Sequence, residues 1–147
     1  MRKIGYILGL LLLLSCEEAA TTHPISSTIQ IEPAEVNIAN EKRIFLYCAT
    51  EQTYTCSNFN LLTTQEVQPN FFRINFSGID KINYCANALG PARAKIDLGA
   101  LQNGDYTLEL NGKTFRNSGT LKITSTEIKL DFPTQDGIAI MQKVFKR

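Results

Sequence analysis

The sequence predicts an all-β protein, an antiparallel β-sandwich of about seven or eight strands, with a small closed β-barrel as the alternative. Short segments in which apolar and polar residues alternate recur at spacings near ten residues, and turn-forming residues separate them. No segment keeps a period of 3.6 residues over three turns, so long helices are not expected. The length of 147 residues fits a single domain.

The expected strands follow one another along the chain, and Pro33 is expected to end the first. The clearest local prediction is a hairpin, because Asn111-Gly112 is the preferred two-residue type I′ turn, in which both residues take positive φ. The segments expected to form strands are residues 28–32, 43–49, 71–76, 93–98, 105–110, 113–115, 119–124, 126–132 and 138–141.

One of these strands carries a family resemblance. Residues 98–108 form a loop that ends in Gly104 and leads into a strand carrying Tyr106. This pattern resembles a recurring element of bacterial immunoglobulin-like domains, in which such a strand directs a tyrosine inward. The resemblance favours an immunoglobulin-like sandwich. A lipocalin-type barrel is less favoured, because the chain contains no Trp and therefore lacks the Gly-x-Trp signature of that family.

The amino terminus has the pattern of an export signal. Arg2 and Lys3 precede residues 4–14, which are almost entirely apolar. Eleven helical residues extend only about 16 Å, whereas the apolar core of a bilayer is about 30 Å thick. Such a short apolar run after basic residues is typical of a secretory signal peptide, here residues 1–15.

The signal ends in Leu13-Leu14-Ser15-Cys16, which resembles the lipobox of bacterial lipoproteins. The resemblance implies cleavage before Cys16, a diacylglycerol on its thiol, added acyl chains such as palmitate, and attachment to the outer membrane. Glu17-Glu18 resembles the surface-export signal of Bacteroidota-type lipoproteins, although an ordinary charged linker has the same composition. Periplasmic and surface display therefore both stay open.

The mature chain is predicted to have two parts. Residues 16–27 have the composition of a flexible tether, and residues 28–147 form the β-domain. His23, the only histidine of the chain, lies in the tether and is expected to be exposed and without a chemical role.

Three cysteines remain if Cys16 is lipidated. An exported protein reaches an oxidising compartment, so one disulfide and one free thiol are expected. Cys48 continues the apolar face of a strand, whereas Cys56 and Cys85 lie in polar, turn-like segments. A Cys56–Cys85 disulfide with a buried, free Cys48 is the favoured arrangement, and Cys48–Cys56 is the main rival.

Neither a catalytic nor a metal centre is expected. A cysteine nucleophile needs a base, normally histidine, and His23 lies in the tether. Zinc is not expected because the sequence contains no Cys-x-x-Cys pair. Asp97, Asp105 and Asp131 lie near strand ends but lack the spacing of a calcium loop. No cofactor is predicted, and a formal charge of +1 gives no sign of nucleic-acid binding.

The function predicted from these features is a lipid-anchored, non-catalytic binding or assembly module, whose partner is an envelope protein or a glycan. Tyr47, Tyr54 and Tyr84 are the aromatic residues best placed for surface recognition. One alternative is a small-ligand carrier or carboxylate-dependent hydrolase in a barrel mouth, although no enclosed pocket with converging carboxylates is expected. The other is a proteinase inhibitor that uses residues 100–104 or 52–58 as a protruding loop. The sequence does not indicate an oligomeric state.

Overall fold

The computed structural model describes residues 22–80, 85 and 87–147. The predicted signal peptide, the lipidation site Cys16 and the tether up to residue 21 lie outside the described residues, as does Tyr84. The strands of the described chain are β1 (Thr22–His23), β2 (Ile29–Ile38), β3 (Glu41–Tyr54), β4 (Asn60–Gln68), β5 (Phe71–Asp80), β6 (Gly90–Gly99), β7 (Gly104–Asn111), β8 (Arg116–Ile123), β9 (Glu127–Asp131), β10 (Ile138–Ile140) and β11 (Val144–Lys146).

The predicted all-β class is confirmed, and the described chain contains eleven strands rather than seven or eight. The strands that the sequence did not indicate are β1, β4 and β11. In β4 only Leu61 is buried, and residues 64–68 are all exposed, so the apolar alternation that marks a strand is too short to detect. Among the residues that the structure describes, no helix is long and apolar enough to span a bilayer.

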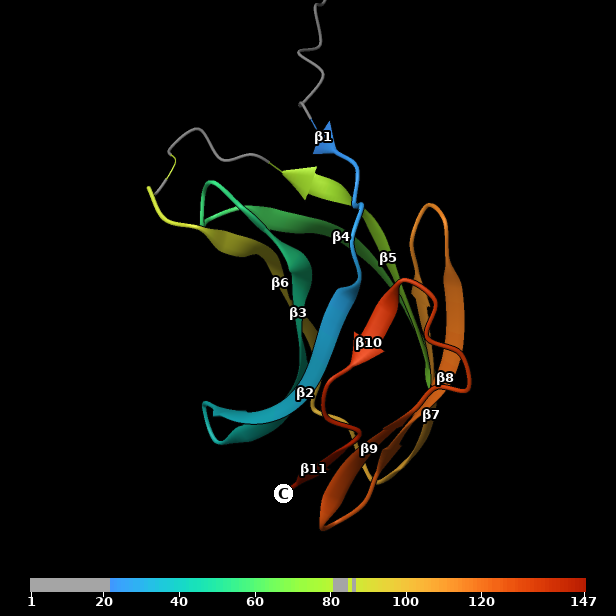
Figure 1. Ribbon diagram of the computed structural model, residues 1–147. Helices are drawn as coiled ribbons and strands as arrows, with labels where there is room; N and C mark the ends of the chain where they lie inside the picture. The colour runs from blue at the N-terminus through green and yellow to red at the C-terminus, as the bar shows by residue number, and fades with distance from the viewer. Residues whose placement is uncertain (1–21, 81–84, 86) are drawn as a thin grey trace, which may run out of the picture.

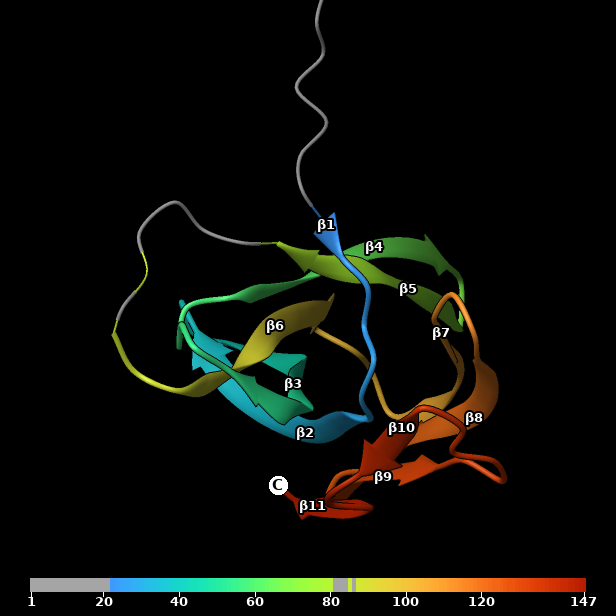
Figure 2. The ribbon, with the colours of Figure 1, turned by 45° about the horizontal axis from the view of Figure 1, so that its top comes forward.

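The strands form one curled sheet in the order β10-β2-β3-β6-β4-β5-β7-β8-β9-β11, with β1 paired to β5 (Figures 1 and 2). Two weak points divide this sheet into two layers. Between β6 and β4 only Asn60 and Arg93 pair. The second weak point lies between β10 and β11, at the two ends of the strand order. β10 pairs with β2 and β11 pairs with β9, and the short segment 141–143 connects β10 to β11. The sandwich layers are therefore connected at both edges, which gives the fold a barrel-like outline.

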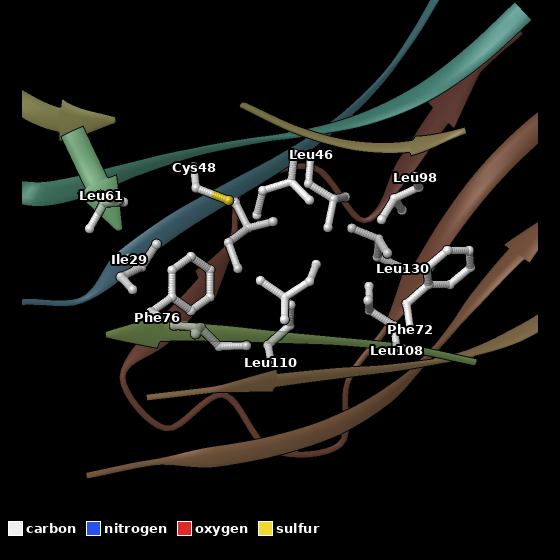
Figure 3. Packing of buried hydrophobic residues seen from close by; sticks show 14 of the residues in the cluster. Ile29, Leu46, Cys48, Leu61, Phe72, Phe76, Leu98, Leu108, Leu110 and Leu130 are labelled. Carbon is white, nitrogen blue, oxygen red and sulfur yellow. The ribbon is translucent and has the colours of Figure 1, made fainter. Parts of the chain in front are cut away.

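Buried aliphatic and aromatic side chains from both layers fill the space between them (Figure 3). Leu46 and Cys48 of β3 point inward from one layer, and Phe76 of β5 and Leu110 of β7 point toward them from the other. Full burial of such a side chain contributes about 1.5–3 kcal/mol. This continuous core fixes which residues of each strand face outward, and hence which residues can form a binding surface.

The hairpin around Asn111-Gly112 has a different turn from the predicted one. Asn111 pairs with Arg116, so the connection is the four-residue segment 112–115, closed by a hydrogen bond from the Gly112 N–H to the Phe115 carbonyl at 2.9 Å. Neither Asn111 nor Gly112 has positive φ. The reason is Phe115, whose ring packs against the core and occupies the space where a side chain on Gly112 would lie.

Two-residue turns occur instead at places that the sequence did not mark. Ala39 and Asn40 both have positive φ, 50° and 67°, which is the type I′ conformation, and they connect β2 to β3. Pro69-Asn70 connects β4 to β5, with φ of 57° at Asn70. Asparagine tolerates this left-handed region better than most residues, which explains its place at both turns.

Pro33 does not end the first strand, contrary to the prediction. The Ile31 carbonyl faces β10, since it accepts a hydrogen bond from the Met141 N–H at 2.9 Å. Backbone groups two residues apart in a strand point the same way, so the Pro33 nitrogen faces this same edge. The β10 pairing stops at Ile31, and the missing N–H of Pro33 therefore costs no ladder hydrogen bond.

The described part of the predicted tether contacts the fold. Thr22 and His23 pair with Asp80 and Ile79 of β5, and His23 is exposed. Ile25 packs against the core cluster, and the Ser26 hydroxyl lies 3.0 Å from the Gln52 side-chain oxygen. The chain is thus held to the sheet from residue 22 onward.

Candidate functional site

The disulfide joins Cys56 to Cys85, as predicted, with a Cα–Cα distance of 5.1 Å. Cys56 is buried near the start of the β3–β4 connection, and Cys85 is exposed in the β5–β6 connection. Among the cysteines that the structure describes, Cys48 is free and buried. Burial raises the pKa of the Cys48 thiol to about 12, so this thiol is protonated at neutral pH and has little nucleophilic character.

The first candidate site is an open groove on the outer face of β2, β3 and β6, here called the Tyr47 groove. Its volume is about 540 Å³. Glu32, Tyr47 and Lys95 lie opposite one another on the three strands, and Gln30, Ala49 and Arg93 form the next row. The groove is lined by Gln30, Glu32, Tyr47, Cys48, Ala49, Asn60, Arg93, Ala94, Lys95 and Met141.

Large apolar side chains are exposed in this groove. Tyr47 is 41% exposed and Met141 is 59% exposed, whereas the neighbouring Phe45 is buried although it also points outward from β3. The Lys95 ammonium covers Phe45 at 4.1 Å from the ring centroid and lies 5.6 Å from the Tyr47 centroid. Lys95 therefore shields one aromatic ring and leaves the other open to a partner.

The groove has an excess of positive charge. Its charged side chains are Glu32, Arg93 and Lys95, and within the described chain none of the three is in an ion pair. Elsewhere on this layer, Asp97 is already paired with Arg43 at 2.8 Å. Burial opposes ionisation of Asp97, but hydrogen bonds from Arg43 and the Gly99 N–H outweigh it and lower its pKa.

Of the three tyrosines that the sequence indicated for recognition, the structure places Tyr47 in a groove. Tyr54 packs instead against the core, with its ring centroid 5.6 Å from that of Phe59, and its hydroxyl is buried. Tyr54 was therefore wrongly expected at the surface. Its polar neighbours in the sequence suggested exposure, but the ring packs beside Phe59 against the core.

A second open groove lies on the outer face of β4, β5, β7 and β8, here called the Arg73 groove. Its volume is about 590 Å³, and its lining consists of Glu66, Arg73, Asn75, Glu109, Asn111, Gly112, Arg116, Asn117 and Ser118. The sequence reasoning missed this site. The available signal was the outward-facing positions of two predicted strands, which carry Arg73 and Asn75 in one and Glu109 in the other.

The remaining carboxylates do not converge on a site in the described chain. Of the residues considered for calcium, Asp97 pairs with Arg43 and Asp131 pairs with Lys129. Among the described residues no group of three His, Cys, Asp or Glu side chains has the geometry to hold a metal ion. The two glutamates of the Arg73 groove approach each other only through Arg73, which bonds both.

The two segments considered as protruding inhibitor loops are both tied down. In residues 100–104, Leu101 packs against the core and the Gln102 carbonyl accepts a hydrogen bond from the Tyr106 hydroxyl at 3.0 Å. Residues 52–54 belong to β3, and Cys56 is held by the disulfide.

Comparison with known proteins adds one finding about the fold. Residues 52–123 match the family model described as the ORF11 beta-sandwich domain. The match runs from the end of β3 to the end of β8 and covers 72 of the 147 residues, including all the lining of the Arg73 groove. It agrees with the sandwich class. No curated protein and no solved structure matches the chain.

Proposed function

We propose that the protein is a lipid-anchored module of the cell envelope that binds a protein partner through the Tyr47 groove and catalyses no reaction. The lipobox-like Leu13-Leu14-Ser15-Cys16, after a short apolar run, supports the anchor and a place among small Bacteroidota-type envelope lipoproteins with immunoglobulin-like domains. Two or three acyl chains anchor a protein stably, at about 0.8 kcal/mol per buried methylene. The anchored domain is displayed on the outer membrane, on its periplasmic face or at the cell surface.

The observation that carries the binding proposal is the pairing of exposed apolar area with unpaired cations. Tyr47 and Met141 lie beside Arg93 and Lys95 in one hollow. Aromatic residues, Met and Arg are enriched in protein interfaces, and Tyr and Arg are frequent among the residues that dominate binding energy. The complementary partner surface carries acidic side chains around an apolar contact. Charge complementarity of this kind mainly accelerates association.

The anchor is tested by replacing Cys16 with Ser. The variant is expected to lose labelling by a radioactive or clickable fatty acid and to leave the membrane fraction, because the lipid is attached to this thiol. A Cys56→Ser variant serves as the matched control, since it removes a cysteine without touching the lipobox. Unchanged membrane attachment and labelling of the Cys16→Ser protein contradict the anchor.

The groove is tested by quantitative affinity capture from intact cells after brief crosslinking. We expect Tyr47→Ala and Arg93→Glu to reduce the recovery of the same envelope protein by about tenfold, the loss typical of an interface residue that dominates binding. Val67→Ala is the control, since Val67 is 62% exposed on β4 outside the groove. A partner recovered equally well by all variants binds elsewhere, and that result refutes the proposal for the Tyr47 groove.

A further inference from the structure

The Arg73 groove differs from the Tyr47 groove in having an almost wholly polar lining. Strand pairing arranges its side chains in two straight rows that cross four strands. The first row is Glu66, Arg73, Glu109 and Ser118, and the second is Thr64, Asn75, Asn111 and Arg116. Neighbouring strands lie about 4.8 Å apart, so each row presents a polar group at a regular interval of that size.

Contacts within the rows hold these side chains in place. The Arg73 Nε donates to Glu109 at 2.7 Å, and its terminal nitrogen donates to Glu66 at 2.8 Å. In the second row the amide of Asn111 donates to Asn75, and the amide of Asn75 donates to Thr64, both at 3.4 Å. The polar groups are therefore ordered before a ligand arrives, which lowers the entropic cost of binding.

The charges of the groove cancel. Glu66 and Glu109 oppose Arg73 and Arg116, and the other polar side chains are neutral amides and hydroxyls. Neither an anion nor a cation is favoured by such a surface. Amide side chains donate and accept hydrogen bonds, as sugar hydroxyls do, and the carboxylates and guanidinium accept and donate in pairs to adjacent hydroxyls.

We propose that the Arg73 groove binds an uncharged glycan chain that lies across strands β4, β5, β7 and β8. Along each row the polar groups recur about every 4.8 Å, a distance comparable with the length of one hexose unit, so successive sugars meet successive strands. The ring of Phe71, in the adjacent outward position of β5, lies under the Arg73 guanidinium at 5.2 Å and supports its orientation. This site shares no lining residue with the Tyr47 groove, so the two proposals are tested by different substitutions.

The test is affinity electrophoresis of the full chain, purified in a non-ionic detergent, in native gels that contain a soluble neutral polysaccharide. The probes are a β-1,3-glucan, an arabinoxylan and an α-mannan, with acidic polygalacturonate as a fourth gel. We expect at least one neutral polysaccharide to retard the protein. Asn111→Ala and Asn75→Ala are each expected to weaken binding about tenfold, because each removes an amide with donors and an acceptor in the row.

Two controls separate this site from general effects. Asn37→Ala removes an exposed amide at the end of β2, far in the sequence from the groove strands, and is expected to bind like the wild type. Tyr47→Ala is also expected to bind like the wild type, which distinguishes this proposal from the proposed function. No retardation by any neutral polysaccharide, retardation by polygalacturonate alone, or unchanged binding of a folded Asn111→Ala protein overturns the proposal.

Discussion

Replacing Asn117 with Ala is expected to destabilise the fold more than its modest size suggests. Asn117 is only 2% exposed. Its amide nitrogen donates to the Asp136 carbonyl at 2.8 Å, and its oxygen accepts from the Asp136 N–H at 2.9 Å and from the Thr134 hydroxyl at 3.4 Å. The Asn117 side chain thus bonds Asp136 as a neighbouring strand would, and it holds the connection between β9 and β10 against β8.

The magnitude follows from the groups that lose their partners. Each polar group left buried without a hydrogen bond costs about 1–3 kcal/mol, and two backbone groups of Asp136 are affected. Asp136 itself is exposed, so part of this loss is recovered by water. We therefore expect the free energy of unfolding to fall by about 2–4 kcal/mol.

The assay is urea unfolding followed by circular dichroism, with amide hydrogen exchange as a local probe. Exchange should accelerate first at Ile29, whose N–H bonds the Gly137 carbonyl at 3.0 Å just beyond the affected segment. Asn37→Ala, at an exposed position, is the matched control and should change stability by less than about 0.5 kcal/mol. An Asn117→Ala protein as stable as this control refutes the reasoning.

Three further predictions concern packing, a buried hydroxyl and pH. A Cβ on Gly119 would lie 2.5 Å from the Asp131 carbonyl oxygen and 2.6 Å from the Phe132 ring, so Gly119→Ala should lower the free energy of unfolding by about 1–3 kcal/mol in urea; unchanged stability contradicts this packing. Tyr54→Phe removes a buried hydroxyl that has no hydrogen-bond partner in the described chain, so thermal unfolding should show equal or higher stability, and a clear loss would show that the hydroxyl is satisfied. Burial opposes ionisation of Glu35, but hydrogen bonds from Arg147 and Lys42 outweigh it and hold its pKa below the usual 4.5. The stability advantage of the wild type over Glu35→Gln should therefore be complete near pH 7 and shrink as the pH falls through this lowered pKa. A constant difference in stability down to pH 3 would show that ionisation of Glu35 does not contribute.

The fold class was predictable because one face of most strands is buried. In β5 and β7 the alternation is nearly complete, and the structure buries Phe72, Ile74, Leu108 and Leu110, as the pattern requires. The same pattern identified Cys48 as a core residue and left Cys56 and Cys85 for the disulfide. Local sequence therefore predicted the strand class, and it favoured the cysteine pairing that the structure shows.

Turns were less predictable because packing over long range decided them. Asn111-Gly112 is the strongest turn signal of the chain, yet the partly buried Phe115 ring packs against the core and the connection has four residues. Conversely, Ala39-Asn40 has little turn signal, but the ten paired residues of β2 and β3 fix both ends of the hairpin and force the type I′ conformation. A local preference of about 1 kcal/mol is comparable with the gain from partly burying one aromatic side chain, so long-range packing can override it.

The candidate sites depend on strand order, which the sequence does not contain. Tyr47 was recognisable as an outward-facing aromatic residue, but Lys95 reaches it only because β6 pairs with β3 rather than with its sequence neighbours. Likewise, Arg73 meets Glu109 because β5 and β7 run parallel, across 36 residues of chain. The sequence of each strand indicates which of its residues face outward. Which outward residues of different strands share a groove depends on the pairing register of the strands, which the structure provides.

The position of β1 relates the two proposed sites to the proposed anchor. Thr22 pairs with Asp80, and Asp80 pairs with Asn60, so the entry of the chain and one end of the Tyr47 groove lie in the same row of the sheet. Arg73 lies seven residues away along β5, which corresponds to about 23 Å at 3.3 Å per residue. Six residues, 16–21, can span at most about 22 Å, so a domain anchored at Cys16 would stay close to the membrane. In a domain anchored as we propose, the Tyr47 groove would therefore lie nearer the attachment point of the chain than the Arg73 groove, and the two proposed partners would not compete for one surface.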